Sequence, residues 1–133
     1  HERLYEGLNS FVERYNSDAY VLVCDEENDK MKRVAECDII YAEADNIYCK
    51  VITFDNCYLH KNTLSDFEKH LKSDSFYRSH RSYLINMNFV ETYSHSEIVF
   101  ENGERALLTK TKHFDFQKTY MAFLNRRNKR TIL

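Results

Sequence analysis

The chain has 133 residues, of which 43% are hydrophobic and 14% aromatic, and its formal net charge is -2. This length and composition suit one folded domain with a short appendage and exclude a disordered tail. No apolar run approaches the roughly 20 residues of a membrane helix, and no leader with a cleavage site opens the chain. We therefore predict a soluble, cytoplasmic chain without a membrane segment.

Residues 1–18 carry a helical pattern. Apolar side chains recur at helical spacing between Leu4 and Val12, which predicts an amphipathic helix over residues 2–15. An amphipathic stripe shows only that apolar surface needs to be covered. Two interpretations stay open: the helix caps the domain, or it is the end of a linker from an upstream regulatory domain.

From Ala19 onward the pattern becomes β-rich. Eight runs are predicted as strands: residues 19–24, 31–35, 38–42, 48–54, 57–61, 89–93, 97–101 and 104–109. Helices are predicted at 63–72, where Thr63 three residues before Asp66 is a start signal, and at about 111–125. Asn102-Gly103 predicts a two-residue turn with positive φ at both positions. Short strands with turns between them favour antiparallel pairing.

The four cysteines lie in or beside apolar, strand-like runs: Cys24, Cys37, Cys49 and Cys57. Their spacing is not that of a metal cluster, in which ligands occur in short pairs. We interpret them as small core residues in a reduced cytoplasm. No metal site and no cofactor are predicted.

The charges are segregated along the chain. Acidic residues outnumber basic ones twelve to five in residues 1–47, whereas basic residues outnumber acidic ones fourteen to nine in residues 48–133. Residues 126–133 form a predicted basic C-terminal tail. Because phosphate binding depends on local positive surface, a mildly acidic chain can still bind DNA through a basic face.

The most informative stretch is residues 76–86, FYRSHRSYLIN, which places two arginines, a histidine and two serines between aromatic and aliphatic residues. Arginine and asparagine match guanine and adenine edges, whereas serine and histidine suit phosphate contacts. If residues 76–80 form a strand, the chain must turn near Arg81 to bury Tyr83, Leu84 and Ile85. Arg81 would then lie on a rigid polar corner, which lowers the entropy cost of binding.

Four blocks occur in an order that is hard to obtain by chance: residues 38–48, residues 63–68, residues 76–86, and Asn102-Gly103 followed by Leu108-Thr109-Lys110. With them, residues 19–124 resemble the LytTR family of bacterial DNA-binding domains. The resemblance implies a mostly β domain over residues 19–125, an elongated sandwich of small antiparallel sheets with short helices.

The resemblance also implies a function. Such a domain is the output domain of a bacterial transcriptional regulator and binds double-stranded DNA sequence-specifically. Its loops, rather than a recognition helix, read direct repeats in successive major grooves. An upstream regulatory domain, often the receiver of a two-component response regulator, usually precedes it, and two domains could meet as a dimer on DNA.

By this resemblance Arg81 enters a major groove, Tyr48 lies in the first DNA-facing loop, and Lys110 follows the last strand. Some relatives carry histidine and arginine at the latter two positions. Tyrosine lacks the charge of histidine, and lysine lacks the fork that arginine offers to guanine. The other candidate DNA contacts are Lys50, Lys61, Asn62, Arg78, Ser79, His80, Ser82 and Lys112.

Three of these side chains have alternative roles. Arg78 could pair internally with an acidic residue such as Glu43, and His80 could make a structural hydrogen bond instead of a phosphate contact. Asn86 is expected to cap a turn through its side chain.

Two other functions have some support in the sequence. A nuclease or phosphotransferase could use His80 with Tyr83 or Ser82, but the motif has no Asp or Glu to hold the metal ions that phosphodiester hydrolysis commonly needs. We therefore predict no catalytic residue and no enzyme. A protein-interaction module with the same fold but without DNA binding is the second rival, which the acidic N-terminal half keeps open.

Overall fold

The computed structural model describes residues 19–132, with side chains for residues 19–128. The helix predicted over residues 2–15 lies outside the described residues. Strands and helices follow in this order: β1 (Tyr20–Asp25), β2 (Lys30–Ala35), η1 (Glu36–Asp38), β3 (Ile39–Asp45), β4 (Tyr48–Thr53), β5 (Cys57–His60), α2 (Leu64–His70), β6 (Phe76–His80), β7 (Tyr83–Asn86), η2 (Met87–Phe89), β8 (Val90–Tyr93), β9 (Glu97–Phe100), β10 (Arg105–Leu107), η3 (Lys110–Lys112) and α3 (His113–Ile132).

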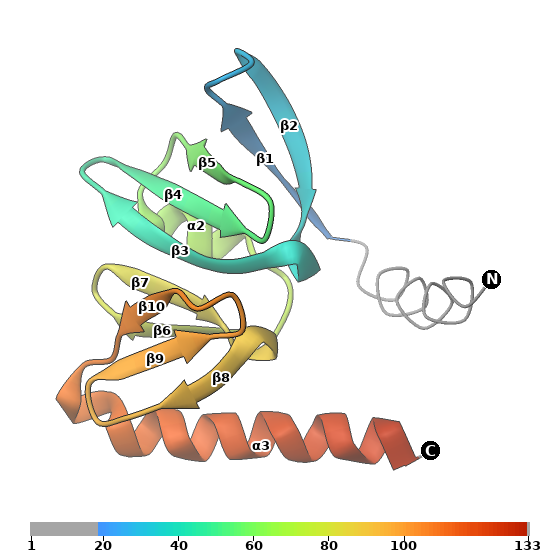
Figure 1. Ribbon diagram of the computed structural model, residues 1–133, viewed down its shortest axis with the longest axis vertical. Helices are drawn as coiled ribbons and strands as arrows, with labels where there is room; N and C mark the ends of the chain where they lie inside the picture. The colour runs from blue at the N-terminus through green and yellow to red at the C-terminus, as the bar shows by residue number, and fades with distance from the viewer. Residues whose placement is uncertain (1–18, 133) are drawn as a thin grey trace.

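The strands form two antiparallel sheets stacked along the long axis of the molecule (Figure 1). One sheet has the order β2-β1-β5-β4-β3-β7-β6, and the other has the order β10-β9-β8. The predicted mostly β fold with antiparallel strands is therefore confirmed, although one sheet has seven strands. A single residue pair, Cys24 with Leu59, joins β1 to β5 in the sheet, and Val23 of β1 is buried in the same core cluster as Val51 and Phe67.

Two hydrophobic clusters lie on opposite faces of the large sheet. Leu84 packs with Phe67 of α2, whereas its neighbour Ile85 packs with Phe100 of β9 and Phe116 of α3. Alternate strand residues point to opposite faces, so one short strand supplies both clusters. The apolar run of β7 is thus buried on both sides, which anchors the turn that precedes it.

Helix α3 extends further than the sequence predicted. It was expected to end near Asn125, before a separate basic tail, but the helix continues to Ile132. No glycine or proline occurs in this stretch, and its lysines and arginines are good helix formers. No helix within the described residues is long and apolar enough to cross a membrane.

The turn at Asn102-Gly103 differs from the prediction. The loop spans residues 101–104, and only Gly103 has positive φ, at 88°. The Gly103 amide donates to the Phe100 carbonyl, while the Asn102 side chain accepts from the Glu104 amide at 3.0 Å. The asparagine side chain therefore closes the loop, and a two-residue turn with two positive φ angles is not formed.

The cysteine prediction holds for Cys49, which is fully buried. It is wrong for Cys57, which is exposed, and Cys24 and Cys37 are partly exposed. Cys57 is the first residue of β5 and pairs with Ile52 of β4, and alternation along the strand directs its side chain away from the face on which its neighbour Tyr58 is buried.

Two predicted caps are present. Thr63 accepts a hydrogen bond from the Asp66 amide at the start of α2. The Asn86 side chain accepts from the Asn88 amide at 3.0 Å and donates to the Ile39 carbonyl at 2.8 Å. The fully buried Asn86 thus holds η2 and ties β7 to the start of β3.

Candidate nucleic-acid interface

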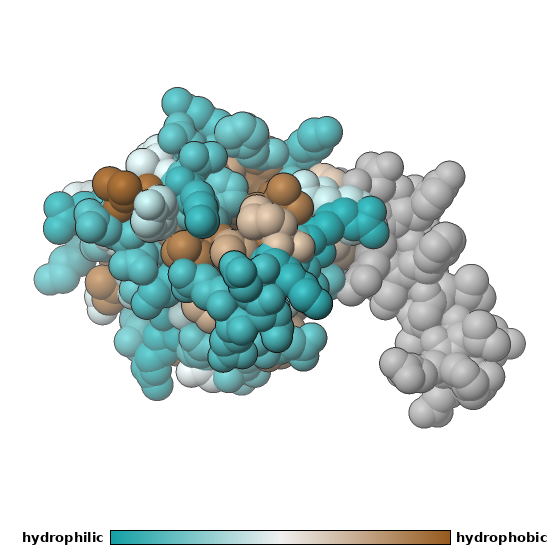
Figure 2. Space-filling view, turned by 90° about the horizontal axis from the view of Figure 1, so that it is seen from above, coloured by the Kyte–Doolittle hydropathy of each residue, from teal (hydrophilic) through white to brown (hydrophobic). Residues whose placement is uncertain are grey.

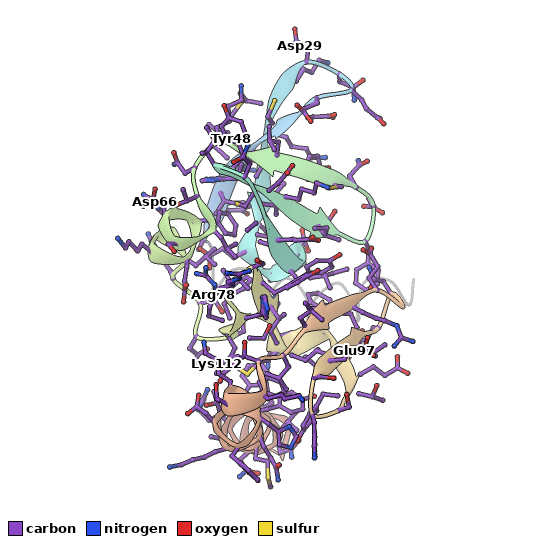
Figure 3. All side chains as sticks on the ribbon, turned by 90° about the vertical axis from the view of Figure 1, so that its left-hand side faces the viewer. Asp29, Tyr48, Asp66, Arg78, Glu97 and Lys112 are labelled. Carbon is purple, nitrogen blue, oxygen red and sulfur yellow. The ribbon has the colours of Figure 1, made fainter. Side chains whose placement is uncertain are left out.

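Four connecting segments lie at one edge of the stacked sheets, which we call the loop edge. It consists of residues 45–48, 60–62, 80–82 and 108–112. Figure 3 faces this edge and shows Tyr48, Arg78 and Lys112 one after another along the long axis. Antiparallel pairing brings these segments together, because the end of one strand lies beside the start of the next.

Backbone hydrogen bonds join the segments of the loop edge. The Ala44 amide donates to the Ser82 carbonyl, and the Thr109 amide donates to the Ser79 carbonyl, both at 2.8 Å. The Lys112 Nζ donates to the Arg78 carbonyl at 2.7 Å. The large sheet, the β6–β7 turn and η3 are therefore held in a fixed relation.

Arg78 is an internal clamp. Its Nε and Nη2 donate to the carbonyls of His80 and Arg81 at 3.0 and 2.5 Å, and its Nη1 pairs with Glu68 Oε1 at 2.8 Å. The internal pairing considered from the sequence is present, but the partner is Glu68 of α2 and not Glu43. With three donor nitrogens bonded within the protein, Arg78 positions the turn.

Arg81 projects from this turn into solvent. The His80 Nδ1 accepts from the Ser82 amide at 3.0 Å, and the His80 ring meets the Tyr83 ring edge-on at 5.9 Å between centroids. The predicted structural hydrogen bond of His80 is therefore present, and the predicted rigid corner around Arg81 is formed. The proton of the neutral imidazole must lie on Nε2, because Nδ1 is an acceptor.

A DNA contact by Ser79 is contradicted. Its side chain is fully buried, and its hydroxyl donates to the Leu107 carbonyl of β10 at 2.8 Å. Alternation along β6 directs Ser79 toward the small sheet while its neighbours point elsewhere. Ser79 therefore joins the two sheets.

The lysines differ in how far they are free to contact a ligand. Lys50, Lys61 and Lys110 are exposed. Lys112 is half-buried, bonded to the Arg78 carbonyl, and 5.8 Å from the centre of the Tyr77 ring. Lys112 therefore holds η3 against β6, a role that its position after the last strand did not reveal.

Three further predicted contacts occupy the loop edge. Tyr48 is 37% exposed and pairs with Asp45 across the β3–β4 turn. Asn62 is exposed, and its amide donates to the His60 Nδ1 at 3.3 Å. Ser82 is half-buried; its amide donates to the His80 Nδ1, and its carbonyl accepts from the Ala44 amide.

Sequence reasoning missed Glu68 and His60 as parts of this edge. Both contribute through contacts between segments that are distant in sequence, so a local pattern does not reveal them. The nearest signal was the start of α2 at Thr63, which places Glu68 in the last helical turns.

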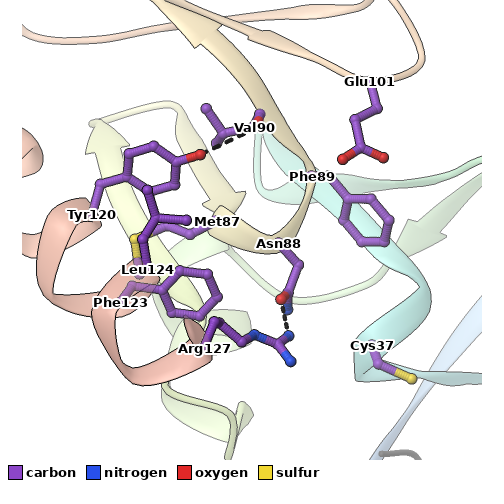
Figure 4. Close-up of a pocket in the computed structure, with 10 residues that line it drawn as sticks. All are labelled: Cys37, Met87, Asn88, Phe89, Val90, Glu101, Tyr120, Phe123, Leu124 and Arg127. Carbon is purple, nitrogen blue, oxygen red and sulfur yellow. Dashed lines mark hydrogen bonds between the residues drawn. The ribbon is translucent and has the colours of Figure 1, made fainter. Parts of the chain in front are cut away.

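An open groove of about 520 Å³ lies between η2, β8 and α3. Figure 4 shows Tyr120 donating to the Val90 carbonyl, and Arg127 bonding Asn88, across this groove. The groove is at the far end of β7 from the loop edge, and none of the predicted contact residues lines it. Within the described part of the chain, no three His, Cys, Asp or Glu side chains are grouped as a metal site.

The fold and the loop edge define a mostly β module that presents cationic side chains from buttressed turns. The family model described as the LytTr DNA-binding domain matches residues 29–121. The chain therefore belongs to the LytTR family, and the resemblance seen in the sequence is confirmed.

Individual proteins agree with this assignment. The chain is 30% identical over 100 residues to the transcriptional regulatory protein NatR of Bacillus subtilis, covering 71% of the chain and 43% of NatR. It is 29% identical over 86 residues to the sensory transduction protein LytT of Bacillus subtilis, covering 61% of the chain and 36% of LytT. The chain spans less than half the length of these curated relatives.

A solved structure is similar over about three quarters of the chain. It is the LytTr DNA-binding domain of a Bacillus cereus protein described as a methyl-accepting/DNA response regulator. The TM-score is 0.66 at 28% sequence identity, and the match covers 76% of the chain and 95% of the solved domain.

Proposed function

We propose that this chain binds double-stranded DNA sequence-specifically as the output domain of a bacterial transcriptional regulator. The observation that carries the proposal is the β6–β7 turn, in which Arg78 and His80 hold the backbone while Arg81 projects into solvent. A buttressed arginine loses little conformational freedom on binding, so its hydrogen-bonding fork can discriminate between bases. Family membership supports the same function.

We assign separate roles to the side chains of the loop edge and to Lys50 of β4 and Arg78 of β6 beside it. Arg81 enters the major groove and reads a base edge, and Tyr48 contacts the DNA from the β3–β4 turn. The exposed lysines Lys50 and Lys110 bind phosphates, since a lysine acts as a point charge. Arg78, His80 and Lys112 position the turns and do not contact bases.

The relatives extend the proposal beyond the domain. NatR and LytT are longer than the matched region, and their names describe transcriptional regulation and sensory transduction. We propose that a receiver or other regulatory domain belongs to the same protein, in the cytoplasm, and that two copies bind direct DNA repeats.

A second function has one observation in its favour. Figure 2 looks onto the end of the molecule that carries β1 and β2 and shows apolar patches on a largely hydrophilic surface. Tyr20, Leu22 and Met31 of this hairpin are 47%, 58% and 56% exposed. Exposed apolar side chains of this kind suit protein contacts, so an interaction module is the alternative.

Selection of bound duplexes from a random DNA pool tests the proposal. A DNA-reading domain should enrich one sequence, and its affinity for that duplex should fall steeply as salt rises, because bound lysines and arginines release counterions. The absence of any enriched sequence at low salt would contradict the proposal and favour the interaction module.

A further inference from the structure

Two turns of the loop edge are built on one plan. In residues 80–82 the His80 Nδ1 accepts from the Ser82 amide at 3.0 Å, and in residues 60–62 the His60 Nδ1 accepts from the Asn62 amide at 3.3 Å. In both turns the residue after the histidine is an exposed cation, Arg81 or Lys61. A histidine that bonds the amide two residues ahead fixes the local backbone and directs the intervening side chain outward.

The two imidazoles are also packed in the same way. The His60 ring meets the Phe67 ring at 4.8 Å and 64°, and the His80 ring meets the Tyr83 ring at 5.9 Å and 66°. Helix α2 supports both turns, because Phe67 contacts His60 while the next residue, Glu68, binds Arg78. One helix therefore sets the relative position of both turns.

The register of the large sheet places the turns in one row. His60 pairs with Cys49, Cys49 pairs with Ala44, and the Ala44 amide donates to the Ser82 carbonyl. Neighbouring strands lie about 4.8 Å apart, so three such steps separate the turns by about 14 Å. The major groove is about 12 Å wide, so a turn inside the groove leaves the other turn beside its phosphate rim.

We propose that residues 60–62 form a second DNA-contacting turn, in which Lys61 binds a backbone phosphate beside the groove that Arg81 enters, and His60 is the positioning residue. This inference rests on the proposed function. Lysine suits a phosphate because its charge needs no planar partner.

The chemistry of His60 agrees with this role. Its Nδ1 must be unprotonated to accept from the Asn62 amide, so the ring must be neutral. Burial lowers the pKa of His60, which favours the neutral ring, and the nearby His70 acts in the same direction, whereas the negative charge of Asp66 acts against them. The turn is therefore stable in the state that holds Lys61 outward.

Lys61→Gln in the 133-residue chain tests the phosphate contact, with binding measured against salt on the selected duplex and on an unselected duplex of the same length. The affinities for both duplexes should fall by the same factor, and the salt slope should drop by about 1. Lys30→Gln is the matched control. Lys30 is exposed beside Asp29, at the tip of the β1–β2 hairpin and the far end of the long axis (Figure 3), and its replacement should change neither quantity.

Two substitutions of His60 separate its hydrogen bond from its packing. His60→Asn keeps an acceptor at the same distance along the side chain, whereas His60→Phe keeps a ring against Phe67 but has no acceptor. The Asn variant should keep the wild-type salt slope, and the Phe variant should reproduce the slope of Lys61→Gln. If the Phe variant keeps the wild-type salt slope and the Asn variant has the slope of Lys61→Gln, the positioning role of His60 is overturned.

The failures are distinguishable. If the wild-type chain binds the selected duplex and Lys61→Gln behaves like Lys30→Gln, this inference is overturned while the proposed function stands. If the wild-type chain enriches no duplex, the proposed function is overturned and this inference falls with it.

Discussion

Arg78→Lys is the substitution that separates positioning from contact most sharply. Lysine keeps the positive charge and can still pair with Glu68, but it cannot also bond the carbonyls of His80 and Arg81, which the guanidinium reaches through Nε and Nη2. We expect the fold to persist while the turn that presents Arg81 loosens. Glu68→Gln is the matched variant, because it removes the ion pair and leaves both carbonyl bonds.

Arg78→Lys should lose more free energy than Glu68→Gln. A hydrogen bond from a charged group contributes about 1.5–3 kcal/mol, and the Arg78 side chain is 22% exposed, so losing two carbonyl bonds should cost about 2 kcal/mol after solvent takes a share. The Glu68 carboxylate is 42% exposed, and an ion pair of this kind contributes about 0.2–1 kcal/mol. If DNA binding must order the loosened turn again, the lost stabilisation of about 2 kcal/mol is subtracted from the binding free energy. Specific binding is then roughly 30-fold weaker.

Binding to the selected and the unselected duplex measures this effect, and urea unfolding measures the change in stability. Arg78→Lys should lose specific affinity and keep binding to the unselected duplex, because the total positive charge is unchanged. Glu68→Gln should change specific binding only slightly. If the two variants lose equal affinity, or if Arg78→Lys binds like the wild type, the clamp does not position Arg81.

Other substitutions test other parts of the molecule. Arg81→Ala should cost about 1–3 kcal/mol of specific binding and relax the preference at one base pair in competition assays; unchanged affinity with a native circular dichroism spectrum would refute base reading. Asn86→Ala should lower the free energy of unfolding in urea by about 2 kcal/mol, because it leaves the Asn88 amide and a buried carbonyl of β3 without their partner; no measurable loss would contradict this. Iodoacetamide should modify exposed Cys57 well before Cys49, whose pKa burial raises to about 12, as peptide mass spectrometry can measure; equal rates would contradict the burial.

Much of the fold could be predicted from local pattern. The eight strands predicted outright start and end within three residues of those observed, and the Phe76–His80 strand and the turn at Arg81 are formed as the motif required. The errors arose where contacts between segments distant in sequence determine the environment of a side chain. Alternation alone could not show that Ser79 faces β10, because the strand that accepts its hydroxyl lies 28 residues away.

The candidate site divides in the same way. Residue type and the family pattern identified Arg81 and the exposed lysines as cations near one another. They could not distinguish a cation that is free from one that is already bonded, since Arg78 and Lys112 have the same composition signal as Arg81 and Lys110. That distinction depends on Glu68 and on the Arg78 carbonyl, whose positions only the packed structure determines.

Part of the acidic surplus of residues 1–47 lies away from the loop edge. The acidic residues around Asp29 lie in the β1–β2 turn, at one end of the long axis, whereas Arg78 and Lys112 lie well along it (Figure 3). At physiological salt, exposed charges farther apart than about 8 Å are largely screened from one another. Once the loop edge contacts DNA, repulsion between the acidic β1–β2 turn and the DNA phosphates therefore weakens binding only slightly. Before contact, at lower salt, the separation of charge turns the basic edge toward DNA, so a net charge of -2 is compatible with a DNA-binding surface.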